Sequence, residues 1–468
     1  MAHPDTIAAL GTPQGTSALA VCRLSGPAAF SILRQLCPNL SRLPEARSVT
    51  LARAQDPDSG EHLDQVLVTV FPGPGSYTGE DQVEVSCHGG WISPNLILDA
   101  VLRLGARQAE EGEFTRRAFL NGKMDLLQVE AVLDLIEGRN RALHGAAIHQ
   151  LERGLSERIG SLREGLIHLE ALLVHHLDFP EEDDPPVPRE EILTRAHELA
   201  AIMERLLETA PEGELLREGA VTVLAGRTNS GKSSLFNALL GQERAIVTEV
   251  PGTTRDALEA VVSLGGFPFR LVDTAGLRDT EEKVERMGIE VAWRYLKGAD
   301  LVLFCVEGER ELEEDERGFL KEISQTPVVL VRTKMDVTDG DRMAEGTGGG
   351  GGPTGHESPM GISGTVVLSV KTGEGLRNLR ELLPSMVFGG LVRMGAEVPV
   401  LTRARHTQGV RQALEELRAF TEGFSEGLPA EVAATHLRPA ETALEELLGV
   451  IPRDEILDRL FREFCIGK

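Results

Sequence analysis

The chain has 468 residues, and its hydrophobic (41%) and charged (26%) contents are those of an ordinary globular protein with room for several domains. Its 73 acidic and 48 basic residues give a net charge of −25, which repels a phosphate backbone and argues against a stand-alone nucleic-acid clamp. The first residues lack the features of a signal peptide, and no apolar run is long enough for a bilayer, so we expect no membrane span.

The five cysteines are scattered, odd in number and without a C-x-x-C pair. This distribution predicts a reducing, cytoplasmic environment and argues against a structural zinc site. Cys465 lies close to the C-terminus, where no core requires it, and it is therefore a candidate catalytic thiol.

The first 120 residues or so have a mixed α/β pattern. Ala18–Leu24 and Gln65–Phe71 are expected to be strands and Ile92–Leu104 a helix, with the Pro/Gly-rich segment Phe71–Ser76 as a loop. Apolar residues then recur at helical spacing from about Asp125 to Glu170.

The pattern changes three more times along the rest of the chain. An acidic, proline-rich break at Pro180–Pro188 precedes helical periodicity over Glu190–Leu216. Strand and helix signals alternate from Val221 to about Leu383, and helices resume over Arg403–Phe464. The glycine-rich stretch 346–364 is expected to be a mobile surface loop.

These changes predict an α/β plus all-α multidomain protein, in which a helical domain is interrupted by an inserted α/β domain. The expected domains are an N-terminal α/β domain (1–122), a discontinuous helical domain (123–216 and 385–468) and the insert (217–384).

The segment Gly226–Ser233 has the pattern G-x-x-x-x-G-K-S between an expected strand, Val221–Ala225, and an expected helix, Ser234–Leu240. In this context, small residues let backbone N–H groups surround a phosphate at a helix N-terminus. Lys232 would reach the β- and γ-phosphates and Ser233 would bind Mg²⁺. Alone, this pattern fits any nucleotide hydrolase, ATPases included.

Four further elements, each in a loop or at the end of an expected strand, narrow the choice. In Pro251–Asp256, Thr254 can complete the Mg²⁺ shell, and Leu271–Gly276 has the D-x-x-G arrangement with Asp273 near the metal. Thr333–Asp336 supplies a carboxylate for guanine N1 and N2, and Ser369–Lys371 supplies backbone donors for guanine O6. The order of these five elements along the chain predicts a Ras-like P-loop G domain that hydrolyses GTP. The expected GTP contacts are Asn229, Ser230, Gly231, Lys232, Ser233, Ser234, Thr248, Thr253, Thr254, Asp273, Thr274, Ala275, Gly276, Thr333, Lys334, Asp336, Ser369, Val370 and Lys371.

Two positions depart from the Ras-like pattern. Thr333 stands where G domains usually have asparagine, so one amide contact near the base is missing or is replaced by a hydroxyl. Leu277 stands where Ras-like proteins have the glutamine that orients the attacking water. A nearby carboxylate must then take that role, unless these carboxylates are a solvated charge run. The candidates are Asp279, Glu281, Glu282 and Glu285.

The negative charge of the transition state also needs a partner. Asn229, with oxygens of Thr248, Val250 and Thr253, could hold a potassium ion where other systems insert an arginine, or Asn229 could simply brace the turn.

The chain resembles the MnmE (TrmE) family of tRNA-modification GTPases over nearly its whole length. Besides the G-domain motifs, the resemblance rests on five segments: Asp5–Leu10, Ser76–Gly90, Gly112–Asp125, Phe179–Asp183 and the terminal Phe464–Lys468.

The resemblance implies a homodimer whose N-terminal domain dimerises and binds a tetrahydrofolate derivative of the 5,10-methylene or 5-formyl type. It also implies a heterotetramer or larger complex with an FAD-containing protein of the MnmG (GidA) type. The complex would add an aminomethyl-type group at C5 of the wobble uridine of certain tRNAs.

By motif position, the resemblance places folate contacts on Arg23, Glu80, Lys123 and Lys468, each of which could otherwise be a surface ion pair. It also assigns Glu285 as the general base, acting through a bridging water. The potassium ligands it implies are Asn229, Thr248, Val250 and Thr253.

Two other classes of protein share some of these features. Ribosome-assembly GTPases have the same G-domain motifs but typically carry a basic RNA-binding appendage, and a scaffold with a vestigial site would not need Lys232, Ser233, Thr254 and Asp273. For the C-terminal tail, we expect docking beside the N-terminal domain with Lys468 as a ligand contact. We expect Cys465 to be secondary, since no histidine or lysine at fixed helical spacing is available to activate its thiol.

Overall fold

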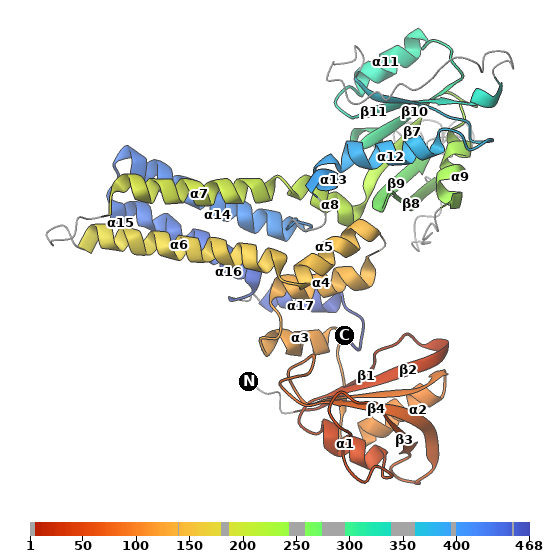
Figure 1. Cartoon of the computed structure of the whole chain (residues 1–468), viewed down its shortest axis with the longest axis vertical. Helices are drawn as coiled ribbons and strands as arrows, with labels where there is room; N and C mark the ends of the chain where they lie inside the picture. The colour runs from red at the N-terminus through yellow and green to blue at the C-terminus, as the bar shows by residue number, and fades with distance from the viewer. Residues whose placement is uncertain are drawn as a thin grey trace, which may run out of the picture. The chain divides into compact units, whose positions relative to one another are not determined.

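The computed structural model describes residues 5–138, 140–178, 187–242, 258–273, 295–337, 361–394, 399–451 and 454–468. The chain divides into two compact units (Figure 1). Unit 1 contains Met1–Ile136, Gln150–Leu199 and Gln412–Lys468, and unit 2 contains Glu137–His149 and Ala200–Arg411.

Unit 1 begins with a six-stranded sheet in the order β3-β4-β5-β2-β1-β6. The pairs along this order are antiparallel except β1–β6, which is parallel. The strands are β1 (Ile7–Leu10), β2 (Gly15–Ser25), β3 (Thr50–Gln55), β4 (His62–Phe71), β5 (Gln82–Gly90) and β6 (Arg107–Gln108).

One face of this sheet is covered, and the other is open only in part. Helices α1 (Ala29–Leu36) and α2 (Ser93–Arg103) share a hydrophobic core with the inward residues of the sheet, Val66 and Val85 among them. The alternation along each strand places other residues on the opposite face, where Leu67 is 40% exposed. This second face is therefore solvated at β3 and β4, whereas at β1 Ile7 and Ala9 are buried on it against Phe114.

The rest of unit 1 is helical. Its elements are α3 (Glu113–Leu120), α4 (Leu126–Glu137), α6 (Gly154–Asp178), α15 (Ala430–Ala433), η3 (Ala434–His436), α16 (Leu437–Leu448) and α17 (Asp454–Arg462). Helix α17 closes a core with α4, in which Leu133 and Phe461 are buried. Arg163 of α6 pairs with Glu445 of α16 at 2.6 Å.

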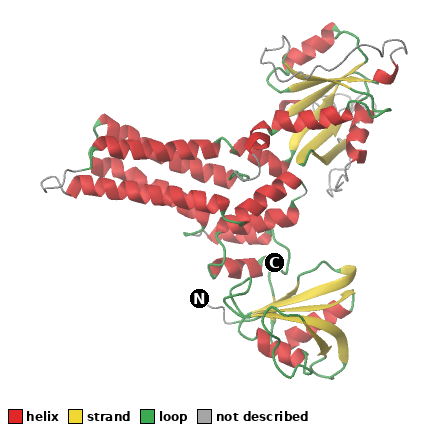
Figure 2. Ribbon diagram, viewed as in Figure 1, coloured by secondary structure: helices red, strands yellow, loops and turns green. Residues whose placement is uncertain are grey.

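Unit 2 contains a six-stranded sheet in the order β12-β11-β10-β7-β9-β8, parallel except for the β8–β9 pair. Helices pack on both faces of it, as Figure 2 shows. One core includes Leu239 of α9 and Leu379 of α12, and the other includes Leu320 of α11. The elements are β7 (Ala220–Ala225), α9 (Lys232–Gln242), β8 (Leu258–Leu264), β9 (Phe267–Asp273), β10 (Leu301–Glu307), α11 (Glu314–Glu322), β11 (Val328–Thr333), η2 (Met335–Val337), β12 (Ile362–Val367) and α12 (Leu376–Val387).

Three shorter helices pack in unit 2 beside this sheet: α5 (Arg141–Leu151), α8 (Ala210–Glu218) and α13 (Gly389–Met394). Leu143 of α5 is buried in the same core as Leu264 of β8. The Asn140 side chain donates to the Leu216 carbonyl at 3.0 Å.

The predicted fold class is confirmed. The chain has an N-terminal α/β domain and a Ras-like insert, and helical segments precede and follow the insert along the sequence. The domain boundaries at 216/217 and 384/385 stay predictions, because the two units divide within α7 (Arg189–Leu207) and α14 (Ala404–Glu426), which run on across the division. Among the described residues, no helix has the length and apolar character to cross a membrane.

Part of one expectation is wrong. Ile362–Gly364, the end of the predicted glycine-rich loop, belongs to β12, where Ile362 pairs with Val328 and Gly364 with Val329 of β11. Sheet pairing overrides the low apolar content of this segment.

Candidate functional site

The loop between β7 and α9, Gly226–Gly231, is called the phosphate loop below. Its backbone has positive φ angles and one close approach that only certain residues allow. Gly226, Asn229 and Gly231 have φ values of 133°, 64° and 91°. A Cβ atom on Gly226 would collide with the carbonyl of Cys305, so only glycine fits there. The loop leads directly into the N-terminus of α9, where backbone N–H groups and the helix dipole favour an anion.

Lys232 and Ser233 begin α9 at the mouth of this loop. The buried Lys232 ammonium donates to the carbonyls of Gly226 (2.9 Å) and Arg227 (2.7 Å), so the cation is held inside the curve of the loop. The Ser233 hydroxyl donates to Oδ2 of Asp273 at 2.8 Å. A hydroxyl beside a carboxylate is the kind of oxygen ligand set that Mg²⁺ takes, and the pair therefore fits a magnesium nucleotide.

A second pair, Asp336 and Ser369, follows the ends of the adjacent strands β11 and β12. Asp336, in η2 after β11, accepts a hydrogen bond from the buried Ser369 hydroxyl at 2.8 Å, and Lys371 lies 3.7 Å from its other oxygen. The hydrogen bond from the Ser369 hydroxyl is the largest cause that holds the pKa of Asp336 below its usual value. Burial opposes it, and a backbone hydrogen bond and the Lys371 charge lower the pKa further. Asp336 is therefore an ionised acceptor for a ligand with paired N–H donors.

Thr333, at the end of β11, faces the phosphate loop. It is 1% exposed, and its hydroxyl donates to the Ser230 carbonyl at 2.7 Å. The next residue, Lys334, has φ 57° and pairs with Glu307 at 3.2 Å. Val370 packs partly against the core of the sheet, and Ser234 is exposed on α9.

The remaining predicted contacts of this site lie outside the described residues. They are Thr248, Val250, Thr253, Thr254, Thr274, Ala275, Gly276 and Glu285. Of the predicted potassium ligands, the structure describes Asn229, an exposed residue whose backbone bends the loop.

Arg227, in the same loop, was not among the residues predicted from the sequence. Its guanidinium pairs with Glu313 at 2.7 Å and Asp315 at 2.6 Å, and it lies 3.6 Å from Glu316. These carboxylates belong to the N-cap and first turn of α11, so a set of ion pairs connects the phosphate loop to that helix.

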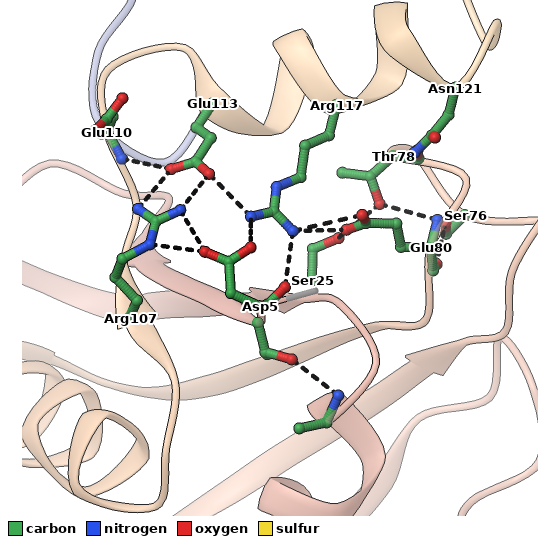
Figure 3. A network of polar contacts seen from close by, with 12 residues as sticks. Asp5, Ser25, Ser76, Thr78, Glu80, Arg107, Glu110, Glu113, Arg117 and Asn121 are labelled. Atoms are coloured by element: carbon green, nitrogen blue, oxygen red, sulfur yellow. Dashed lines mark hydrogen bonds and ion pairs between the residues drawn. The ribbon is translucent and has the colours of Figure 1, made fainter. Parts of the chain in front are cut away.

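A second polar cluster lies in the N-terminal domain of unit 1 (Figure 3). Arg117 of α3 is 1% exposed, and its guanidinium pairs with Asp5 (2.9 Å), Glu80 (3.1 Å) and Glu113 (2.9 Å). Arg107 pairs with Asp5 and with Glu113, at 2.8 and 2.6 Å. Burial alone would raise the pKa of Glu113, but bonds from Arg107, Glu110 and Arg117 hold it below the usual value.

Two of the predicted folate contacts, Glu80 and Lys123, already bind other groups of the N-terminal domain. Glu80 accepts from Arg117 and, at 2.8 Å, from the Ser25 hydroxyl, so its carboxylate is fixed before any ligand binds. The exposed Lys123 donates to the Pro74 carbonyl at 2.9 Å.

The other two predicted folate contacts lie where the C-terminal tail meets the sheet. Phe114 N–H donates to the Lys468 carbonyl at 3.1 Å, and Ile466 forms an antiparallel bridge with Glu111. Arg23 donates to the Gly467 carbonyl at 3.3 Å. The expected docking of the tail beside the N-terminal domain is therefore confirmed, with Cys465 exposed.

Charges and rings gather at this junction. Arg23 also pairs with Glu84 at 2.9 Å, and its guanidinium carbon lies 5.8 and 5.7 Å from the ring centres of Tyr77 and Phe114. Burial, and then the like charge of Arg23, lowers the pKa of Lys468. The two cations and two rings at this junction suit an aromatic ligand that carries carboxylates.

Two protein-family models match this chain. Residues 6–123 match the family model described as the GTP-binding protein TrmE N-terminus, and residues 126–465 match the MnmE helical domain. Among solved structures, the G domain of the T. maritima FeoB iron transporter is 31% identical over 36% of this chain and 98% of that chain, with a TM-score of 0.26.

Curated relatives match over the full length. The proteins named tRNA modification GTPase MnmE from Moorella thermoacetica, Listeria welshimeri and Geobacter metallireducens are 41%, 39% and 38% identical, each over 99% of this chain and 99% of the relative. The chain therefore belongs to the MnmE family of tRNA modification GTPases.

Proposed function

We propose that this chain is a potassium-activated GTPase that, with an FAD-containing partner of the MnmG (GidA) type, modifies C5 of the wobble uridine of certain tRNAs. The product would be an aminomethyl-type group built with a tetrahydrofolate one-carbon unit. GTP hydrolysis in tRNA modification follows from membership of the family. The observation that carries the proposal is the combination of Lys232, which follows the phosphate loop after β7, and Asp336, which follows β11 at the same edge of the sheet.

For hydrolysis, the described residues bind and orient the nucleotide. Phosphate oxygens would replace the Gly226 and Arg227 carbonyls as the acceptors of Lys232, while Ser233 and Asp273 would hold Mg²⁺ together with Thr254. Mg²⁺ supplies charge neutralisation on the phosphates. Glu285 would orient the attacking water, because Leu277 cannot.

For base selection, Asp336 accepts the two N–H donors of guanine. The Ser369 hydroxyl fixes one carboxylate oxygen at 2.8 Å, so the carboxylate is already oriented before the base arrives. Lys371 is 84% exposed and can move to the edge of the ring.

For the one-carbon donor, Glu80 would accept the N–H groups of the pterin, and Arg23 and Lys468 would bind the carboxylates of the folate tail. Arg117 acts here as a positioning residue, because it fixes the Glu80 carboxylate. The folate supplies the carbon. Lys123 would join the site by exchanging its bond to the Pro74 carbonyl for one to the ligand.

The open face of the N-terminal sheet supports a homodimer formed through this domain. Leu51 and Leu67 are paired across β3 and β4 and are 59% and 40% exposed, and Val49 is 66% exposed. A second copy would cover this apolar surface. With a net charge of −25, the chain would rely on its partner protein for much of the tRNA contact.

We place the protein in the cytoplasm because its five thiols are unpaired, four of them buried and Cys465 exposed. The alternative, a ribosome-assembly GTPase, is disfavoured by the acidic chain and by an N-terminal domain that matches the TrmE family model.

Rates of GTP hydrolysis with Mg²⁺ in potassium, rubidium or sodium test the proposed hydrolysis. We expect turnover about 10³-fold faster in potassium than in sodium, with rubidium able to replace potassium, because an ion at this position neutralises transition-state charge. Asn229→Gly, which keeps the positive φ but removes the amide, should lose most of the difference. Equal rates in potassium and sodium would remove the cation from the mechanism.

A further inference from the structure

Thr333 is a predicted nucleotide contact whose side chain is buried and whose hydroxyl is engaged by the protein. A hydroxyl has one hydrogen to donate, and the Ser230 carbonyl, at 2.7 Å, is closer to it than the Val306 carbonyl at 3.4 Å. With 1% of the residue exposed, Thr333 has almost no surface to offer a base.

The hydrogen bond from Thr333 to Ser230 spans the carboxyl ends of neighbouring strands in the middle of the sheet. Thr333 ends β11 and the phosphate loop follows β7, while β10 lies between these two strands. The Thr333 carbonyl accepts from the Gly308 N–H at 2.9 Å, which anchors the backbone of the residue on the segment after β10. The side chain is therefore a short rigid arm from one strand end to the phosphate loop.

The peptide that the arm holds is central to that loop. A Cβ atom on Gly231 would lie 3.1 Å from the Thr333 hydroxyl oxygen and 3.2 Å from its Cβ, so the two residues are in close contact. The Gly231 carbonyl accepts from Leu235 N–H at 2.9 Å and so begins the bonding of α9. Because a trans peptide directs C=O and N–H oppositely, fixing the Ser230 carbonyl also turns the Gly231 N–H away from Thr333.

We propose that Thr333 is a positioning residue, which holds the Ser230–Gly231 peptide in the conformation that binds nucleotide phosphates, and that it does not read the base. This rests on the proposed GTPase function and deepens it. Base selection then belongs to Asp336, and phosphate affinity depends in part on a residue that touches no ligand atom.

Three substitutions test the arm. Thr333→Val keeps the shape and removes the donor, Thr333→Ala removes the donor without a new methyl group, and Thr333→Ser keeps the hydroxyl. We measure KM and kcat for GTP, dissociation of fluorescent GDP, and the ratio of GTP to xanthosine triphosphate turnover.

In the Val and Ala variants, KM and the GDP dissociation rate should rise about 10-fold, because an unpaired buried carbonyl destabilises the loop. The kcat value should change far less and the base ratio should stay at the wild-type value. Thr333→Ser should lie within about 2-fold of wild type for each quantity, since its donor remains.

Amide hydrogen exchange of the peptide that contains residues 227–233, in nucleotide-free protein, measures whether Thr333 stabilises the phosphate loop. This measurement does not depend on enzyme activity. The Val and Ala variants should exchange faster there, and the wild-type rate should remain in Thr333→Ser. Wild-type exchange in both donor-free variants would overturn the proposal, as would an altered base ratio or a Ser variant as weak as Val.

The proposed function fails in a different way. If wild-type protein binds no guanine nucleotide, or if Asp336→Asn keeps its preference for GTP, the assigned nucleotide chemistry is wrong, while the exchange measurement still decides whether Thr333 holds the loop.

Discussion

The two candidate sites are built in opposite ways. In the G domain, the phosphate loop is one contiguous segment, and Ser233 meets Asp273 across 40 positions of the chain. In the N-terminal domain, Arg117 reaches Asp5 across 112 positions and Arg23 reaches Gly467 across 444. A site of the first kind can be read from short motifs, whereas the second exists only once the whole of unit 1 has folded.

The forces that hold them also differ. Lys232 rests on two backbone carbonyls, which phosphate oxygens can replace. Arg117 is buried among three carboxylates, two of which, Asp5 and Glu113, otherwise pair only with the 45% exposed Arg107 among the cations that the structure describes. Changes in the G domain should therefore affect turnover before stability, and changes around Arg117 should affect stability before turnover.

The largest expected effect is on turnover. Glu285→Ala should lower kcat for GTP by about 10²–10⁴-fold with GTP affinity close to wild type, because the residue would touch only the attacking water. Steady-state kinetics and equilibrium GTP binding check this. Should Glu281→Ala or Glu282→Ala prove to be the damaging change, the neighbouring carboxylate has the role.

Next comes the stability of the N-terminal domain. Arg117→Met should lower its free energy of unfolding by about 3–5 kcal/mol, because it leaves buried carboxylates unpaired. Arg107→Met is the matched control: that side chain is 45% exposed and should cost far less. Urea denaturation measures both. A loss in Arg117→Met no larger than in Arg107→Met would break the contrast between the two sites.

The tail should separate the two activities. Deletion of residues 465–468 removes Lys468 and the Arg23–Gly467 hydrogen bond, so tRNA modification should be lost while GTP hydrolysis stays within about 2-fold, as expected for independent sites. Cys465→Ser should be milder than the deletion. A covalent adduct between Cys465 and tRNA would make the thiol the nucleophile and contradict this account.

The smallest effect is in pH dependence. Despite opposing burial, the arginines hold the folded-state pKa of Asp5 and Glu113 below the ordinary 3.8 and 4.5. The stability that the two carboxylates contribute is therefore complete at pH above their ordinary pKa values. It is lost as the pH falls through their lower pKa values in the folded state. Urea unfolding across this acid range should be steeper with pH in wild type than in Arg117→Met. Equal slopes would show that the pairing contributes nothing.

Much of the G domain could be predicted because its chemistry is local. The strand before the phosphate loop was predicted as Val221–Ala225 and found as Ala220–Ala225, because an apolar run followed by glycine permits few alternatives. The contact of Thr333 with Ser230 could not be predicted, since a sequence does not show which strand end lies beside which loop.

The N-terminal site was less accessible to sequence reasoning. Arg117 and Glu84 were missed, although Glu84 alternates with the buried Val83 and Val85 and so had to lie on the open face. Nothing local shows that an arginine in α3 is buried, because its burial depends on two carboxylates from other parts of the fold, Asp5 and Glu80, as well as on Glu113 one turn away.

The central claim is that two separate sites serve one tRNA modification. Mass spectrometry of tRNA nucleosides from a strain without this protein tests it most directly, with complementation by wild type, Lys232→Ala or the chain lacking residues 465–468. We predict that the C5 aminomethyl-type wobble uridines are lost in the strain and restored only by wild type. Their persistence in the strain without the protein, or their restoration by either variant, would contradict the claim.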